Sequence, residues 1–238
     1  MVVFRWLSNL ICKNFWILFF VLLLPSVVKS APLKNTDPLE LYPNNIVFDV
    51  FRNDEIVGKH RVFFSKIGND KVRVVAQLNL QVNFLSFPIY KFDYKSDAVW
   101  SHGKLRSLRS NQNDDGESLT VKVLQKNDWL TVITGDTEFR TDIDTLPTNH
   151  WNAEVLVRDK VINTLTGELS SVRITNLGKE KIEAQAKLVF ATKYKYSGDI
   201  AALVWYSDGG NWVKMQFEGK DGSNINYECI ECGLGKKK

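Results

Sequence analysis

The feature that most constrains this chain is a hairpin signal near its C-terminus, WYSDGGNWVKMQF at residues 205–217. Two apolar runs flank Gly209-Gly210, and a two-residue Gly-Gly loop suits a hairpin because glycine adopts positive φ without steric cost. The register predicted by this loop sets Tyr206 against Val213, Val204 against Met215 and Ala202 against Phe217. One face of the hairpin is then apolar, and a shift by one residue would mix the two faces.

The clearest single strand lies at residues 71–84, where apolar side chains alternate with mainly polar ones. Clean alternation is typical of an antiparallel sheet with one solvated face. Further apolar runs follow, separated by turn signals roughly every ten residues, which is typical of a meander. We therefore expect an all-β fold, an antiparallel meander of about ten to thirteen strands that forms a barrel or curved half-barrel with one short helix. The helix is expected at 148–157, with Thr148 or Asn149 as its N-cap.

Residues 1–30 resemble a secretory signal, because Arg5 and Lys13 precede an apolar run from Phe15 to Leu24. We expect cleavage after Ser30 and export to the periplasm, with retention as a membrane anchor as the alternative. Residues 31–238 are then expected to form a single β-rich domain, with a flexible N-terminal segment at 31–45 and a short C-terminal tail.

The charge of the chain does not favour a nucleic-acid partner. The whole sequence has 31 basic and 27 acidic residues, a net charge of +4. Removal of the signal takes Arg5, Lys13 and Lys29, so that 28 basic residues face 27 acidic ones, a net charge of +1. Nucleic-acid-binding domains carry a clustered basic surface, and here the basic residues are dispersed apart from the three terminal lysines.

Aromatic residues gather on the inward face of one predicted strand and in two other segments. They are Tyr90, Phe92, Tyr94, Trp100, Trp151, Tyr194 and Tyr196. Ligand pockets are mostly apolar and aromatic, with a few polar groups such as tyrosine hydroxyls. These residues therefore predict either a pocket for a lipid or other apolar ligand or a filled core.

Two further sets of residues could carry chemistry. Cys229 and Cys232 are the cysteine pair left after export, and in an oxidising compartment a disulfide is expected, with a redox pair or a metal as alternatives. His150 with Asn152 is a candidate polar site, although no carboxylate can be placed beside the histidine from sequence. His60 is expected to be a surface or hydrogen-bonded histidine. No catalytic residue, metal site or cofactor is predicted.

Several segments resemble a family of exported proteobacterial proteins catalogued as a domain of unknown function. They are EIVGKHRVFFS (55–65), the strand that ends at Trp100, NHWNAEVL (149–156) with NTLTGEL (163–169), KYKYSGDI (193–200) and WYSDGGNWVKMQF (205–217). The resemblance implies a β-rich envelope protein with no assigned activity.

The function expected from these patterns is a non-enzymatic periplasmic binder or carrier of a lipid or other apolar molecule, with transient contact to the envelope. One alternative is an envelope enzyme or assembly factor that uses His150 or the Cys229/Cys232 pair. The other is a structural envelope protein with a filled core. Ligand identity and oligomeric state stay open.

Overall fold

The structure is a computed structural model that describes residues 37–235. One α-helix, α1 (Pro38–Leu41), and one 3₁₀-helix, η1 (Ala153–Val157), accompany the strands. The strands are β1 (Ile46–Arg52), β2 (Glu55–Ile67), β3 (Lys71–Phe84), β4 (Phe87–Ser101), β5 (Lys104–Asp114), β6 (Glu117–Lys126), β7 (Trp129–Thr134), β8 (Thr137–Asp142), β9 (Leu146–Pro147), β10 (Lys160–Ile162), β11 (Leu169–Ala184), β12 (Lys187–Gly198), β13 (Ala202–Ser207), β14 (Trp212–Glu218) and β15 (Asn224–Glu231).

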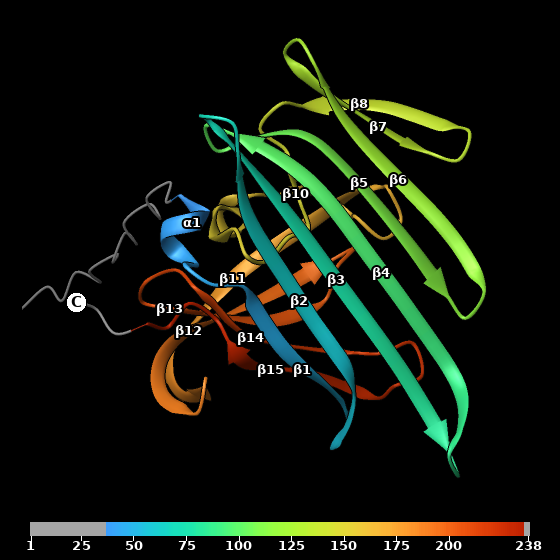
Figure 1. The fold of residues 1–238 in the computed structure, drawn as a ribbon, viewed down its shortest axis with the longest axis vertical. Helices are drawn as coiled ribbons and strands as arrows, with labels where there is room; N and C mark the ends of the chain where they lie inside the picture. Colours follow the sequence, from blue (N-terminus) through green and yellow to red (C-terminus); the bar gives the residue numbers. More distant parts are fainter. Residues whose placement is uncertain (1–36, 236–238) are drawn as a thin grey trace, which may run out of the picture. The chain divides into compact units, whose positions relative to one another are not determined.

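These strands form one sheet of simple topology. β1 to β8 lie side by side in chain order, β9 to β15 do the same, and the pairing of β1 with β15 joins the two runs. Every pairing is antiparallel except that of β9 with β10. Figure 1 shows the long strands β2 to β6 on one side and strands β11 to β15 on the other. The predicted all-β antiparallel meander is therefore confirmed, although the sheet has fifteen strands and its ends do not pair.

The end strands, β8 and β9, are the two edges of the sheet, and side chains only partly fill the seam between them. Gly167, with φ of +77°, lies so close to Thr134 that a Cβ at this position would come within 1.8 Å of the threonine Oγ1. Thr164, in the same loop, accepts a hydrogen bond from Tyr94 OH at 2.9 Å through its Oγ1 and one from Ser110 Oγ at 2.6 Å through its carbonyl oxygen. The segment between β9 and β11 thus packs against the inner face of the long strands.

The short helix is present but begins later than predicted. Asn152, not Thr148 or Asn149, is the N-cap of η1, and its Oδ1 accepts a hydrogen bond from the Glu154 N–H at 3.0 Å. The three missed strands, β8, β9 and β10, are short or lie beside this irregular segment. Their few residues carry too little alternation to mark a strand.

The predicted β13–β14 register is right in the strands and wrong at the turn. Leu203 pairs with Gln216 and Val204 with Met215, as expected, but Tyr206 pairs with Trp212 because a bulge interrupts the ladder. The Ser207 N–H donates to the Asn211 carbonyl oxygen at 2.9 Å, so the loop holds three residues, and only the second of its glycines, Gly210, has positive φ.

The described part of the N-terminal segment contacts the barrel. Asp37 caps α1 by accepting a hydrogen bond from the Leu39 N–H at 2.9 Å. Tyr42 follows the helix and is buried; its hydroxyl donates to the Trp151 carbonyl oxygen at 3.1 Å and accepts from the Trp212 N–H at 2.9 Å. Tyr42 thus joins this segment to the barrel interior, and the flexibility expected for residues 31–45 stays a prediction.

The predicted signal segment and its cleavage site lie outside the described residues. Among residues 37–235, neither helix has the length or the apolar character that crossing a membrane requires.

Candidate functional site

The first group of predicted ligand-binding residues has become a packed core. Trp151 meets the ring of Trp100 edge-on at a centroid distance of 5.3 Å and that of Phe64 at 5.5 Å. Both tryptophans are at most 5% exposed. Tyr94 and Phe92 lie on the same inward face of β4 and are also buried. These residues fill space between the sheet and the segment that carries Trp151.

The second group surrounds His150 on the other side of the same segment. The His150 ring lies 5.6 Å from Tyr196 and 5.4 Å from Trp212, and Tyr194 meets Tyr206 at 6.0 Å. Tyr196 is buried, whereas Tyr194 is only partly so. Six of the seven aromatic residues are therefore divided between two packed clusters, and the seventh, Tyr90, lies outside both.

His60 is the residue that sequence reasoning placed wrongly. Its side chain is partly buried and points inward, where its ring meets those of Trp212 at 5.4 Å and Tyr227 at 5.6 Å. Both ring nitrogens are buried and find no hydrogen-bond partner among the described residues. Burial, together with the charge of His150, lowers the pKa of His60 to about 3. The signal available in the sequence was its position in β2, two residues before buried Val62 on the inward face.

His150 and Asn152 do not form a joint polar site. Burial lowers the pKa of His150 to about 4, and its Nδ1 has no partner within residues 37–235. The Asn152 side chain is engaged as the helix cap. A neutral imidazole surrounded by aromatic rings, without a carboxylate partner, lacks the arrangement of a general base.

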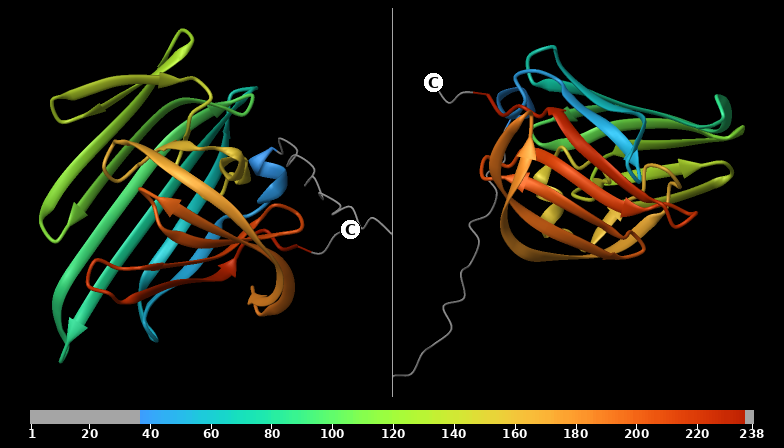
Figure 2. Two further views of the ribbon diagram at one scale, coloured as in Figure 1. Left: turned by 180° about the vertical axis from the view of Figure 1, so that it is seen from behind. Right: turned by 90° about the horizontal axis from the view of Figure 1, so that it is seen from below.

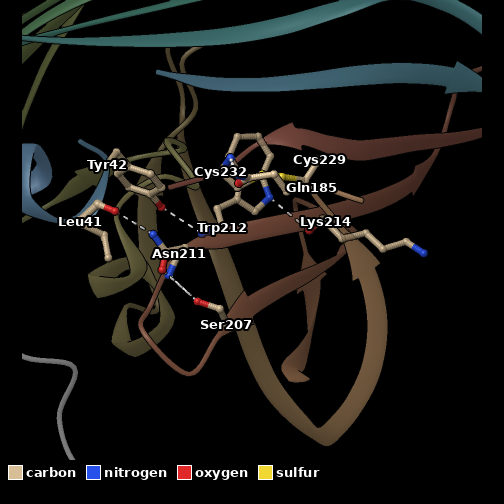
Figure 3. The surroundings of a disulfide bond; sticks show 9 residues. All are labelled: Leu41, Tyr42, Gln185, Ser207, Asn211, Trp212, Lys214, Cys229 and Cys232. Atoms are coloured by element: carbon tan, nitrogen blue, oxygen red, sulfur yellow. Dashed lines mark hydrogen bonds between the residues drawn. A yellow bond between two sulfur atoms is a disulfide. The ribbon is translucent and has the colours of Figure 1, made fainter. Parts of the chain in front are cut away.

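The disulfide joins Cys229 of β15 to Cys232, whose Cα atoms lie 6.1 Å apart (Figure 3). Both cysteines are buried, so the end of the chain around them is core rather than a loose tail. The tip of the β11–β12 hairpin lies beside them: the Gln185 N–H donates to the Cys229 carbonyl oxygen at 2.8 Å, and Gln185 Oε1 accepts from the Cys232 N–H at 3.2 Å. This environment suits a structural disulfide. No group of three or more metal-ligating side chains in the described part of the chain is placed to hold a metal ion.

An apolar track runs along the inward face of β3 and β4 from the core to the tip of the hairpin. Its successive cross-strand pairs are Val74 with Ala98, Ala76 with Ser96, Leu78 with Tyr94, Leu80 with Phe92, Val82 with Tyr90, and Phe84 with Phe87. The first pairs are buried, Leu78, Leu80, Val82 and Tyr90 are partly buried, and the last pair is exposed. The apolar face that fills the barrel therefore continues beyond the region where other strands cover it.

Tyr90 lies where this track leaves the core. Its hydroxyl donates to Asp114 Oδ1 at 2.7 Å, which lowers the pKa of the Asp114 carboxyl. Burial raises the pKa of the Tyr90 hydroxyl, and the bond to Asp114 raises it further. Tyr90 thus presents an apolar ring with a fixed polar end. Of the seven predicted aromatic residues, it is the one that lies on the partly buried section of the track.

Two open hollows lie elsewhere on the surface. One lies over the outer face of β3 to β6 and is lined by polar side chains that include Asn79, Asp93 and Asn111. The other lies at the seam and is lined by Thr134, Phe139 and Gly167 among others. Several groups in the first hollow already bond to one another, as Asn79 does to Asp93 at 2.7 Å. Neither hollow brings together a nucleophile and a base.

The fold and its packed interior define a β-barrel-like protein, and a solved structure supports this class. A crystal structure of a β-barrel-like protein of domain of unknown function DUF1849 from Brucella abortus superposes with a TM-score of 0.57 over 81% of this chain and 98% of that one, at 8% sequence identity. At this identity the likeness concerns the fold alone.

The chain belongs to the family described as domain of unknown function DUF6134, whose model matches residues 48–230. This confirms the predicted resemblance to a β-rich family without an assigned activity. No curated protein sequence matches the chain.

Proposed function

We propose that this protein is a non-enzymatic envelope protein that binds a lipid or another molecule with an extended apolar chain. The observation that carries the proposal is the apolar track on β3 and β4, in which the inward pairs pass from buried to exposed without a charged side chain. Apolar surface that is only partly covered is unfavourable in water and marks a place where a ligand adds stability.

The track has the shape that a single acyl chain requires. From Leu78 to Phe84 the strand advances six residues, roughly 20 Å at 3.3 to 3.4 Å per residue. The Gln112 side chain adds a polar group at the inner end, because Gln112 pairs with Tyr94 and so shares the inward face. The Tyr90 hydroxyl adds a second polar group further out, beside Val82. A ligand with a polar head and an apolar tail fits such a surface.

The packed interior changes the site expected from sequence. Phe92, Tyr94, Trp100, Trp151 and Tyr196 are buried, while Tyr90 is only partly buried and is placed to touch a ligand. A role for Tyr194, which is partly exposed near the other cluster, stays a prediction. Export to the periplasm also stays a prediction and sets the compartment in which this proposal applies.

The test is direct titration of the purified full-length protein with a fluorescent fatty acid. Leu80→Asn places a polar side chain in the middle of the track and is expected to weaken binding at least tenfold. Gln81→Ala, the next residue on the outward face, is the matched control and should leave the affinity unchanged. Equal affinity of the Leu80→Asn variant and the parent, with both folded by thermal melting, would contradict the proposal, as would failure of the parent to bind.

A further inference from the structure

The tip of the β3–β4 hairpin is the most apolar exposed part of the described molecule. Phe84, Leu85, Phe87 and Ile89 are 59–78% exposed within six consecutive residues. Figure 1 shows this hairpin reaching out at the lower right, and the view from behind in Figure 2 shows the same projection. A solvated turn is ordinarily polar, so this composition needs a separate explanation.

The turn at this tip contains residues that are unfavourable for its backbone conformation. Phe84 pairs with Phe87, so Leu85 and Ser86 form a two-residue loop, with φ of 48° and 72°. Such loops favour Asn-Gly because both central residues lie in the left-handed region, which is unfavourable for leucine. The leucine is thus placed at the far end of the hairpin against local preference.

Apolar groups surround the ribbon at its tip rather than lie on one face. Phe84 and Phe87 share the face of the track, and Pro88 pairs with Asn83 on the opposite side. Ile89 is the extra residue of a bulge between the Asn83–Pro88 and Val82–Tyr90 pairs. A protein groove covers one face of a ribbon and leaves the other in water, whereas a lipid bilayer surrounds an inserted tip on all sides.

The distribution of charge agrees with a bilayer. The sequence from Val74 to Tyr90 has no charged residue, and the first charge is Lys91, opposite Gln81. Lys91 lies five residues from Ser86, about 17 Å along an extended strand. Interfacial protein segments bury their apolar side about 5–10 Å into the boundary of headgroups and acyl chains, so the tip can enter without burying a charge.

The neighbouring turns carry acidic groups, and two of these form salt bridges. Lys220 Nζ lies 3.1 Å from Asp114 Oδ2, and the Arg52 guanidinium lies 2.6 Å from Asp221 Oδ2. Asp54, Glu55 and Asp115 lie in the same set of turns. The acidic groups of these turns outnumber the basic ones, Arg52, Lys91 and Lys220, so attraction to anionic lipid is weak and apolar contact must supply the affinity.

We propose that the β3–β4 tip, residues 84–89, inserts into the surface of a lipid bilayer. The inference deepens the proposed function, because an inserted tip places the apolar track next to its source of acyl chains. Insertion itself needs only the tip and is measured separately from ligand binding.

The experiment uses an environment-sensitive dye on the full-length protein. The dye is attached at Ser86→Cys in a Cys12→Ser background, and a matched sample has it at Ser118→Cys, an exposed site in β6 on the outer face. Vesicles of phosphatidylcholine and phosphatidylethanolamine, with and without phosphatidylglycerol, are added. We expect a blue shift and quenching by brominated acyl chains at position 86 only, with affinities that agree within about twofold between the two compositions.

A double variant separates the tip from the rest of the chain, including residues 1–30. Leu85→Ser with Ile89→Ser changes the turn and the bulge residue, which lie outside the pairs of the track. It should reduce the vesicle-dependent dye signal at position 86 at least tenfold and leave fatty-acid titration of the soluble protein unchanged. A dye at position 86 that stays in water with both vesicle types overturns the insertion proposal, and the fatty-acid titration still decides the proposed function by itself. Signal only with phosphatidylglycerol, undiminished in the double variant, also overturns it, because charge and not the apolar tip would then be responsible.

Discussion

The β3–β4 and β11–β12 hairpins end in the same kind of turn, but their tips lie in different environments. Each closes with two left-handed residues that are neither glycine nor asparagine: Leu85 and Ser86 in one, Gln185 and Ala186, both with φ of 54°, in the other. Such residues cost roughly 1–2 kcal/mol each in this conformation. The first hairpin projects into solvent, whereas the second folds back onto the barrel.

The β11–β12 tip recovers its cost through contacts with the rest of the molecule. β14 pairs with β15 only as far as Glu228, and the Gln185 N–H takes the next position by donating to the Cys229 carbonyl oxygen at 2.8 Å. Ile182 and Ala184 are buried by the same approach. The curled hairpin is visible in Figure 2.

Trp205 shows what this hairpin covers. It points to the outer face of β13, because its neighbours Val204 and Tyr206 are inward core residues, yet it is only 2% exposed. The ammonium groups of Lys193 and Lys214 lie 4.9 and 5.3 Å from its ring centroid, and its indole N–H donates to Glu180 of β11. The folded hairpin thus makes a second small core on the outside of the sheet.

The comparison teaches that local strain at a turn does not itself indicate function. At β11–β12 the strain is offset within the chain, and the turn needs no partner. At β3–β4 the same strain comes with exposed apolar side chains, so the compensating contact belongs to another surface. Three predictions test this difference.

Acid should produce the largest change in the free energy of unfolding. The change should come from His60 and His150 in the barrel interior, and membrane insertion of the β3–β4 tip should not depend on pH. His60 and His150 have folded pKa values of about 3 and 4, below the ordinary value of 6.5. As pH falls below 6.5, the unfolded chain takes up two protons that the folded protein does not, so stability is full above 6.5 and declines until about pH 4 for His150 and about pH 3 for His60. At about 1.4 kcal/mol per pH unit for each histidine, the expected loss between pH 6.5 and pH 4 is on the order of 7 kcal/mol.

Denaturant unfolding at several pH values measures this loss. His60→Phe should halve the slope between pH 6.5 and 4, while the dye at position 86 should report the same vesicle affinity per folded molecule, because the tip itself has no titrating group. Carboxyl groups with lowered pKa, such as those of Asp97 and Asp114, contribute stability that is lost only near and below their ordinary value of 3.8. An unchanged free energy of unfolding from pH 7 to 4.5 would contradict the burial of both imidazoles.

The second effect should come from a charge placed under the folded hairpin. Ala184→Glu puts a carboxylate at a position that is 1% exposed and is expected to cost about 3 kcal/mol or more. Leu188→Glu, on the same hairpin but exposed, and Phe87→Glu, at the free tip, should each change stability by about 0.5 kcal/mol or less. Equal destabilisation by Ala184→Glu and Leu188→Glu in chemical denaturation would mean that the hairpin does not fold back.

The same two hairpins show how far the sequence allows prediction. The strands from Ile46 to Thr134 follow from alternation and turn signals, since each has one buried face. One-sided alternation from Ile182 to Phe190 predicts a single strand over residues 180–196. This prediction is wrong, because the β11–β12 turn lies at Gln185-Ala186, which carries no turn residue, whereas Asn176 and Gly178, which do, form a bulge. Only tertiary contacts at Cys229 accompany the turn.

The site was predictable in part for a similar reason. Strand parity places the aromatic residues of β4, Tyr90 to Trp100, on the inward face, but parity does not say what packs against them. The segment around Trp151 supplies that packing. Because its backbone is irregular, its sequence shows no hydrophobic periodicity from which its position could be predicted. His60 was misplaced because a single histidine in a strand has no pattern that distinguishes the inward face from the outward one, apart from its position two residues before Val62.

The smallest effect concerns the two turns themselves. Leu85→Asn with Ser86→Gly relieves left-handed strain at the free tip, and the protein should gain about 1 kcal/mol because no contact is lost there. Gln185→Asn with Ala186→Gly relieves the same strain but shortens the side chain whose Oε1 accepts from the Cys232 N–H at 3.2 Å, so its gain should be smaller or absent. Thermal and urea unfolding of the two double variants measure the difference. The β3–β4 variant should become more stable while its vesicle affinity falls, because a turn selected for stability alone would not contain Leu85; a stabilised variant that keeps its full affinity would leave the leucine without the role proposed for it.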